Sequence, residues 1–179
     1  MIKLDAKQLR ASRPNESEVR KIKRRQIYII CDDILDTYNI GSIFRLADAV
    51  AASCVYLCGQ TATPPYHRIA KAAVGTEKWV PWQYASTAAE AVSSIKYLVS
   101  SIKIIAIEQS KKSIDYRKAD LSEPVAFIVG HETTGVSKEA LALADQIVEL
   151  PMYGVNISLN VMVSLAIVLF KTVESKLVN

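Results

Sequence analysis

The stretch Leu150-Pro-Met-Tyr-Gly-Val-Asn-Ile-Ser-Leu-Asn160, followed at once by the apolar run Val161–Phe170, is the most informative part of the chain. It places a strand end, a loop and a helix start in direct succession. Pro151 fixes one backbone dihedral angle, and Gly154 permits backbone conformations that other residues avoid. Such a strand–loop–helix transition is typical of α/β proteins, in which ligands bind beside the loop.

The same stretch carries polar side chains that are suited to hold a ligand. Asn156, Ser158 and Asn160 supply donors and acceptors, and Asn156 or Ser158 is placed to cap the helix that follows. Free amides at a helix N-terminus favour a polar ligand nearby. The competing interpretation is an ordinary turn, because Pro-x-x-Gly before serine is common between strands and helices.

Size and composition indicate one soluble globular domain. The chain has 179 residues, of which 50% are hydrophobic and 22% charged, so it is long enough for a full core and close to average in charge. Val161–Phe170 is too short to cross a membrane, and Lys171 and Glu174 follow it closely. The segment Met1–Asp5 lacks the apolar core of a signal peptide. We therefore expect a cytoplasmic protein without a membrane partner.

The cysteines and histidines do not indicate a metal site. Cys31, Cys54 and Cys58 are odd in number and lie in apolar, strand-like surroundings, while His67 and His131 are isolated. Without a second cysteine pair, buried free thiols are the favoured interpretation.

Positive charge is concentrated at the N-terminus. Residues 1–25 carry nine Lys and Arg against three Asp and Glu, a net charge of +6, whereas residues 26–179 have a net charge of −2. The cluster formed by Lys21, Lys23, Arg24 and Arg25 fits an arm that contacts phosphates. Alternatively, it is a solvated lead-in to the first strand.

Apolar runs and helical periodicity alternate along the rest of the chain. Strands are expected at Ile27–Cys31, Cys54–Cys58, Lys103–Ile107, Val125–Val129 and Gln146–Leu150, with an edge strand at Trp79–Trp82. Helices are expected at Glu16–Ile22, Asn39–Ala52, His67–Ala73, Thr87–Ser100, Ser137–Ala144 and Ser158–Leu177. This alternation predicts an α/β fold with a doubly wound parallel sheet covered by helices on both faces.

Three loops that follow strands are expected to meet at one edge of this sheet. They are Asp36–Gly41, Gly130–Gly135 and Pro151–Ser158. Ligands in such folds bind at the carboxyl ends of the strands. The chain lacks the Gly-x-Gly-x-x-Gly dinucleotide pattern, the P-loop pattern and the Gly-x-Ser-x-Gly hydrolase pattern, so those three chemistries are excluded as interpretations.

Together the loops resemble a known family. Asn39-Ile-Gly-Ser-Ile-Phe-Arg45, Gly130-His-Glu-Thr-Thr-Gly-Val-Ser137 and Pro151-Met-Tyr-Gly-Val-Asn-Ile-Ser-Leu-Asn-Val161 are similar, in order and spacing, to the three motifs of the SpoU, or TrmH-like, ribose 2′-O-methyltransferases of the SPOUT superfamily. Lys71–Trp82 also resembles a segment of these proteins. The resemblance covers about residues 26–175, which defines a methyltransferase domain at 26–179 behind an arm at 1–25.

The resemblance implies a fold, a cofactor and an assembly. Family members tie the C-terminal part of the sheet in a deep trefoil knot, bind S-adenosylmethionine in the knot loops and act as homodimers. Carried over to this sequence, the cofactor contacts fall on Ile107, Gly130, Leu150, Met152 and Leu159. Strand-end loops offer the apolar slot and main-chain groups that adenine requires.

The implied reaction is methyl transfer to a ribose 2′-hydroxyl of RNA, without a metal. Arg45 is the residue most closely tied to removal of the hydroxyl proton. Because a free guanidinium has a pKa above about 12, stabilisation of the developing alkoxide is preferred to a role as base. Asn39 is expected to sit at a helix start and orient the ribose or Arg45. Glu132 is expected to hold the second loop or to pair with Arg45, while Ser158 and Asn160 shape the site.

The RNA partner is expected to be tRNA rather than rRNA, contacted by Arg45 and the arm residues Lys21, Lys23, Arg24 and Arg25. Two alternatives remain open. One is a non-catalytic RNA-binding module that retains the fold, although the motif residues that a decayed relative would lose are present. The other is methylation of a base instead of the ribose.

Overall fold

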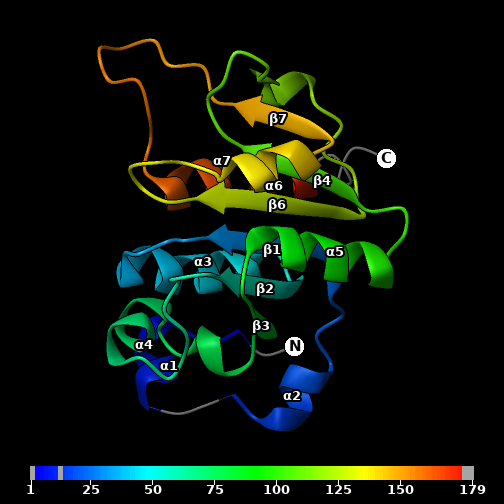
Figure 1. Ribbon diagram of the computed structural model, residues 1–179. Helices are drawn as coiled ribbons and strands as arrows, with labels where there is room; N and C mark the ends of the chain where they lie inside the picture. The colour runs from blue at the N-terminus through cyan, green and yellow to red at the C-terminus, as the bar shows by residue number, and fades with distance from the viewer. Residues whose placement is uncertain (1–2, 12–13, 175–179) are drawn as a thin grey trace.

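The computed structural model describes residues 3–11 and 14–174, and its centre is a seven-stranded sheet (Figure 1). The strand order is β3-β2-β1-β6-β4-β7-β5, and every pairing between these strands is parallel. The strands are β1 (Arg25–Asp32), β2 (Ala52–Cys58), β3 (Trp82–Ala85), β4 (Lys103–Ile107), β5 (Ile114–Asp115), β6 (Val125–Gly130) and β7 (Gln146–Glu149). The predicted parallel α/β architecture is therefore confirmed.

Helices cover both faces of the sheet. One apolar cluster joins alternate residues of β1, such as Ile27 and Ile29, to α3 (Thr37–Ala49), α4 (His67–Ala73) and α7 (Val161–Glu174). The other joins Ile30 to α5 (Ala88–Leu98) and α6 (Lys138–Leu143). Because the central strands are buried on both faces, they read in the sequence as continuous apolar runs.

Short elements complete the chain. The N-terminal arm contains α1 (Ala6–Ala11) and α2 (Glu16–Arg20), which lie below the sheet in the view of Figure 1. Two single-turn 3₁₀ helices, η1 (Thr76–Lys78) and η2 (Tyr116–Lys118), precede and follow short strands.

Close contact between α3 and α4 explains the glycine of the first motif. A Cβ atom at Gly41 would lie 2.6 Å from both the Cβ of Ala72 and the carbonyl oxygen of Ile69. Any side chain at this position would force the two helices apart. The glycine is therefore a requirement of helix–helix contact, which in turn fixes the position of α3 at the site.

Several predicted boundaries differ from the structure. The edge strand begins at Trp82, where the prediction ended it, because Trp79 follows the 3₁₀ turn and donates its indole N–H to Asp48 over 2.7 Å. The last helix begins at Val161 instead of Ser158, and the predicted segment 175–177 lies outside the described residues. The two-residue strand β5 was not predicted, since it is too short to show periodicity.

The cysteines are free and buried, as predicted. Burial raises the pKa of the Cys31 thiol, and raises the pKa of Cys54 and Cys58 to about 12, so all three remain protonated near neutral pH. Among residues 3–11 and 14–174, no cluster of three His, Cys, Asp or Glu side chains is arranged to hold a metal ion. No described helix has the length and apolar composition that crossing a membrane requires.

Candidate active site

A cavity of about 570 Å³ opens at the carboxyl ends of the neighbouring strands β6, β4 and β7. Its size lies within the range of about 300–1,000 Å³ that small-molecule and cofactor sites occupy. The second and third motif loops both contribute to its wall. The sheet topology thus brings together loops that are far apart in the sequence, as the strand-end argument predicted.

The residues predicted to contact a cofactor all lie in this cavity. Ile107 ends β4 and Gly130 ends β6, while Leu150, Met152 and Leu159 come from the segment after β7. None of the five carries a charge, so the cavity has an apolar portion. The structure brings these five residues together around one cavity.

Tight backbone geometry shapes the second motif loop. His131 and Gly135 exchange two backbone hydrogen bonds, of 3.1 and 2.9 Å, which close the turn. A Cβ atom at Gly130 would lie 2.3 Å from the backbone of Gly135, and Gly135 itself has a positive φ of 71°. Both glycines are therefore needed for the turn that presents Glu132.

Glu132 ties the second motif loop to the start of α3. Its carboxylate accepts hydrogen bonds from the backbone N–H groups of Leu35, at 3.2 Å, and Asp36, at 3.0 Å. It also accepts one from the side-chain amide of Asn39, at 2.9 Å. These contacts connect the second loop to α3 and the segment before it, and the described ion pairs include none between Glu132 and Arg45.

These hydrogen bonds change the acidity of Glu132. Desolvation alone raises the pKa of the carboxyl group, but the bonds from Asn39 and from backbone N–H groups outweigh it. The pKa of Glu132 therefore lies below its ordinary value, and the side chain is an anion at neutral pH. A negative charge at the N-terminal end of α3 is also favoured by the helix dipole.

Asn39 links the first motif to the third. The residue is only 5% exposed, and its side-chain oxygen accepts a hydrogen bond of 3.0 Å from the amide of Asn160. The prediction that Asn39 sits at the helix start is corrected: α3 begins at Thr37, and Asp36 caps it by accepting from the N–H of Tyr38 at 2.8 Å. Asn39 lies within the first turn, where its side chain reaches across to the other loops.

Asn160 also replaces Asn156 and Ser158 as the predicted cap of the last helix. Its side-chain oxygen accepts from the backbone N–H groups of Met162, at 2.9 Å, and Val163, at 3.4 Å. Asn156 instead accepts from the N–H of Ser158 at 3.3 Å, one turn earlier. Asn160 therefore performs two tasks, because it caps α7 with its oxygen and donates to Asn39 with its nitrogen.

Ser158 and Arg45 occupy different positions relative to the cavity. Ser158 lies in the cavity wall together with Glu132 and Asn160. Arg45 is exposed on α3, nearly two turns beyond Asn39, and does not line the cavity. A ligand confined to the cavity would not reach its guanidinium, so any role of Arg45 concerns a molecule that extends beyond the cavity.

Three further cavity residues were missed by the sequence analysis. Glu108 accepts from the N–H of Val136 at 2.8 Å, and Glu149 accepts from the hydroxyl of Ser113 at 2.7 Å. Gln109 donates its side-chain amide to the carbonyl oxygen of Ile157 in the third loop. The sequence could have indicated Glu108 and Gln109, because they directly follow the predicted strand Lys103–Ile107 and ligands bind at strand ends.

The charges around the cavity are mainly negative. Glu108, Glu132 and Glu149 line it, and its lining contains no lysine or arginine. Their carboxylates favour a ligand that carries positive charge and disfavour a polyanion inside the cavity.

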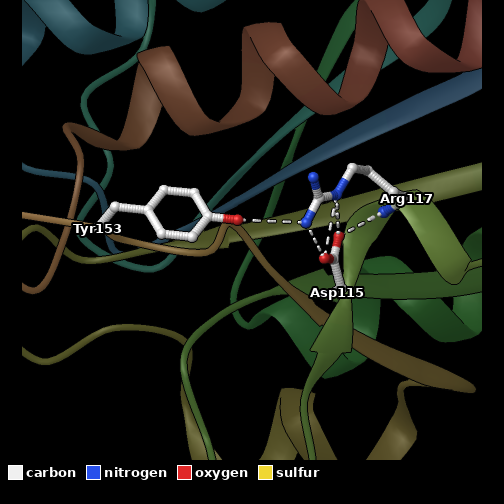
Figure 2. Close-up of polar contacts among 3 residues, drawn as sticks. All are labelled: Asp115, Arg117 and Tyr153. Carbon is white, nitrogen blue, oxygen red and sulfur yellow. Dashed lines mark hydrogen bonds and ion pairs between the residues drawn. The ribbon is translucent and has the colours of Figure 1, made fainter.

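The third motif loop is the open side of the site. Tyr153, Val155 and Ile157 are exposed by 86%, 102% and 74%, respectively. Figure 2 shows that the Tyr153 hydroxyl receives a single 3.5 Å hydrogen bond from Arg117, whose guanidinium is also paired with Asp115. In Figure 1 this orange loop stands clear of the body of the protein. Exposed apolar side chains of this kind are typical of surfaces that take part in interactions.

The basic arm residues lie away from the cavity. The last of them, Arg25, is the first residue of β1 and the others precede it, so they lie at the amino-terminal edge of the sheet rather than at the carboxyl edge. Arg24 donates to the carbonyl oxygen of Trp79 at 2.9 Å, and Arg25 donates to Glu123 at 2.7 Å. Lys21 pairs with Glu18, and Lys23 is exposed. At least Arg24 and Arg25 therefore help to attach the arm to the domain.

Comparisons with known proteins agree with this site. The model of the SpoU rRNA Methylase family matches residues 26–170. The tRNA (guanosine(18)-2′-O)-methyltransferase of Escherichia coli (strain K12) is 34% identical over 155 residues, which is 84% of this chain and 65% of that enzyme. The chain thus spans slightly less than two thirds of the length of that relative.

Solved structures share the fold. The Aquifex aeolicus TrmH/SpoU tRNA modifying enzyme superposes with a TM-score of 0.75 at 28% identity, covering 96% of this chain and 83% of that one. The AdoMet-bound rRNA methyltransferase from Sinorhizobium meliloti gives a TM-score of 0.74 at 29% identity, covering 91% of this chain and 58% of the other. Both similarities extend across nearly all of the chain.

Proposed function

The chain belongs to the SpoU rRNA Methylase family, and on this premise we propose that it is an S-adenosylmethionine-dependent methyltransferase acting on a ribose 2′-hydroxyl of structured RNA. One observation carries the proposal: the three motif loops converge at one cavity through the hydrogen-bonded chain Glu132–Asn39–Asn160. A tRNA substrate is favoured over rRNA because the E. coli and A. aeolicus relatives are described as tRNA enzymes. A tRNA substrate would also place the protein in the cytoplasm.

The cavity fits S-adenosylmethionine in size, shape and charge. Ile107, Leu150 and Leu159 offer an apolar slot for the adenine, and Gly130 and Met152 present backbone there. The neighbouring carboxylates of Glu108 and Glu149 favour the sulfonium and ammonium groups of the cofactor. When bound, the cofactor supplies an electrophilic methyl group, whose transfer to the ribose O2′ releases a thioether and the hydroxyl proton.

The motif residues then act on the ribose. Arg45 stabilises the negative charge that develops on O2′, a role for which its exposed guanidinium outside the cavity lining is available to bound RNA. Ser158, in the cavity wall, shapes the side of the cavity at which the ribose meets the cofactor. Glu132 and Asn39 act as positioning residues, since they fix the start of α3 and therefore the helix that carries Arg45. Asn160 fixes the last helix in the same way.

The proposal includes the knot and the homodimer of the family. Support for the knot comes from structural similarity to the A. aeolicus enzyme over 96% of this chain. Support for the dimer comes from apolar side chains left exposed on the third loop and on α7, among them Val155, Ile157 and Phe170. A second copy of the chain would cover these side chains and complete the open side of the site.

Lys21, Lys23, Arg24, Arg25 and Arg45 remain the proposed RNA contacts from the sequence, with residues 1–25 as an arm beside a methyltransferase domain at 26–179. Lys23 and Arg45 have exposed side chains that suit this role. Arg24 and Arg25 contact protein groups, and they would contribute to RNA binding mainly through the field of their charge.

The decisive experiment is transfer of a labelled methyl group from S-adenosylmethionine to unmodified total RNA, followed by alkaline hydrolysis. A 2′-O-methyl group blocks cleavage at its own phosphodiester, so the label is expected in alkali-resistant dinucleotides from the tRNA size class. Label in mononucleotides alone would indicate base methylation. Binding of RNA without cofactor binding or transfer would indicate a non-catalytic module.

Replacement of Arg45 by alanine tests the assigned role directly. We expect kcat to fall by about 10²-fold or more, because a preorganised charge at the developing oxyanion is lost, while cofactor affinity stays unchanged. The control is Arg68→Ala, which removes another exposed arginine from the neighbouring helix α4. Full activity of the Arg45→Ala protein would refute the role.

A further inference from the structure

A second cavity, of about 730 Å³, lies between α6 and the β7–β5 edge of the sheet. We refer to it as the lysine groove. Its apolar wall includes Ile114, Leu141 and Ile147, and its rim carries Lys111, Lys112 and Lys138. No residue of the three motifs lines the groove. Lys138, the first residue of α6, directly follows the second motif. The lysine groove is therefore separate from the active-site cavity.

The three rim lysines carry charge that nearby carboxylates do not neutralise. All three side chains are exposed, and none has a carboxylate within 4.0 Å among the described residues. Two other basic residues of this part of the chain are paired, since Arg117 contacts Asp115 (Figure 2) and Lys103 lies 2.7 Å from Asp120. A cluster of free ammonium groups remains at one end of the groove.

The acidic residue of the groove does not offset these lysines. Asp145 accepts from the backbone N–H of Ile104 at 2.7 Å and lies 3.8 Å from Lys96. It stands just before β7, at the amino-terminal edge of the sheet, whereas the lysines follow the carboxyl ends of β4 and β6. Positive charge is thus concentrated at the end of the groove that faces the active-site edge.

The groove and the active-site cavity are lined by consecutive residues of one segment after β4. Glu108 and Gln109 line the cavity, and the next residues, Ser110 to Lys112, line the groove. The two ends of this segment differ in charge, because Glu108 lies in the cavity and Lys111 and Lys112 lie in the groove. A polyanion that delivers one nucleotide to the methyl donor would be repelled by the cavity lining and attracted by the adjoining rim.

From this arrangement, and resting on the proposed function, we propose that the lysine groove is an RNA-binding site for a nucleotide that flanks the methylated one. Lys111, Lys112 and Lys138 contact backbone phosphates at its mouth. The apolar wall beside Ile114 and Leu141 accommodates the base or ribose of the same nucleotide. The groove lies at the opposite lateral edge of the sheet from β3, so these contacts are additional to Arg45 and to the N-terminal arm.

The test compares two double variants that remove the same charge. Lys111→Ala/Lys112→Ala removes two rim lysines, whereas Lys71→Ala/Lys78→Ala removes two exposed lysines from α4 and η1 near the β3 edge. Binding to an unmodified tRNA transcript is measured by fluorescence anisotropy at several salt concentrations. Cofactor binding is measured by calorimetry on the same proteins. All four side chains are exposed, so both variants are expected to fold.

We expect the rim variant to bind the transcript about tenfold more weakly near physiological salt, with a log–log salt dependence shallower by about 1.4 to 1.8, since each lost phosphate contact removes about 0.7 to 0.9. Adding Lys138→Ala should reduce the slope further by about the same amount per contact. The affinity for S-adenosylmethionine should stay within about twofold of the wild-type value. The lysines are exposed and lie outside the cavity, so salt screens the effect of their charge on the bound cofactor.

Three results would overturn the inference. The first is equal RNA affinity and salt dependence in the rim and control variants, with wild-type binding intact; the proposed function would then survive without the groove. The second is unchanged RNA binding with lost binding of poly-glutamate, which would assign the groove to an acidic protein partner. The third is a wild-type protein that binds the cofactor but no RNA, which would refute both the groove and the proposed substrate.

Discussion

The two loops that frame the active-site cavity, residues 131–136 and residues 151–160, are attached to the protein in different ways. The first closes on itself between His131 and Gly135, and its Glu132 accepts three hydrogen bonds from α3 and the segment before it. The second projects apolar side chains into solvent and is held mainly by Gln109, Arg117 and Asn39. One side of the site is thus held by several hydrogen bonds, whereas the other is largely exposed.

This difference predicts where substitutions will act. Changes in the first loop should alter stability, since they break contacts that exist before any ligand binds. Changes in the second loop should alter ligand affinity with little effect on stability, since the loop has few contacts to lose.

The largest expected effect follows from Glu132→Ala. Three donors lose a charged acceptor, and we expect the free energy of unfolding to fall by about 2 kcal/mol, a value reduced because Glu132 is partly exposed. For a chain of this size the midpoint of thermal unfolding should fall by about 4–8 °C. Glu139→Ala, on the exposed side of α6, is the control. A midpoint of thermal unfolding within about 1 °C of wild type would contradict the conclusion that contacts of the first loop stabilise the protein before any ligand binds.

A smaller effect should appear in the pH dependence of stability. Because the folded-state pKa of Glu132 is lowered, its contribution is present above the unfolded-state value of about 4.3 and is lost as the pH falls through the folded-state value. The stability difference between wild type and Glu132→Gln, measured by urea unfolding, should therefore be largest at neutral pH. It should shrink in acid, and a constant difference down to about pH 3 would contradict the lowered pKa.

On the open side, Gln109→Ala should act on binding. The change removes the hydrogen bond to the carbonyl oxygen of Ile157 and frees the third loop. We expect S-adenosylmethionine to bind about two- to tenfold more weakly by calorimetry, the range that one net hydrogen bond supports, with nearly unchanged thermal stability. Gln83→Ala, an exposed glutamine on β3, serves as the control. A stability loss matching that of Glu132→Ala would show that the third loop is also preformed.

The smallest effect is expected from Tyr153→Phe. The lost hydroxyl makes a single contact of 3.5 Å at a side chain that is 86% exposed, so both cofactor affinity and unfolding temperature should change negligibly. The pair of Arg117 with Asp115 would remain, since hydrogen bonding from Arg117 already lowers the pKa of Asp115 to about 2. A clear loss of cofactor affinity would instead assign Tyr153 an anchoring role.

Much of the fold was predictable because its strongest signals are local. Strands β1, β2, β4 and β6 contain continuous apolar runs, and such runs arise when a strand is buried on both faces. The strand-end rule then placed the cavity, and the five residues proposed for the cofactor lie in it. By contrast, β5 was missed because a strand of two residues is too short to show a hydrophobic periodicity. The start of β3 was misplaced because a 3₁₀ turn occupies residues just before it.

The partners of the site residues were less predictable than the residues themselves. Asn39 and Glu132 are 93 positions apart in the chain, and Asn39 and Asn160 are 121 apart, so no local pattern links them. The sequence predicted Asn39 at a helix start, and it offered a pair of Glu132 with Arg45 as one of two alternatives. In the structure Asp36 caps α3, and the turn closed by Gly135 directs Glu132 to the start of that helix, where it contacts Asn39.

The sequence by itself determined the alternation of strands and helices, the glycines that tight turns and helix contact require, and the motif residues that gather at one edge. Those properties depend on side-chain type and short spacing, which the chain carries directly. Only the tertiary structure decided that Glu108, Glu132 and Glu149 gather at one cavity, and that Lys138 joins Lys111 and Lys112 at the groove. Charge at a surface depends on which distant residues become neighbours or neutralise one another, and folding alone establishes that.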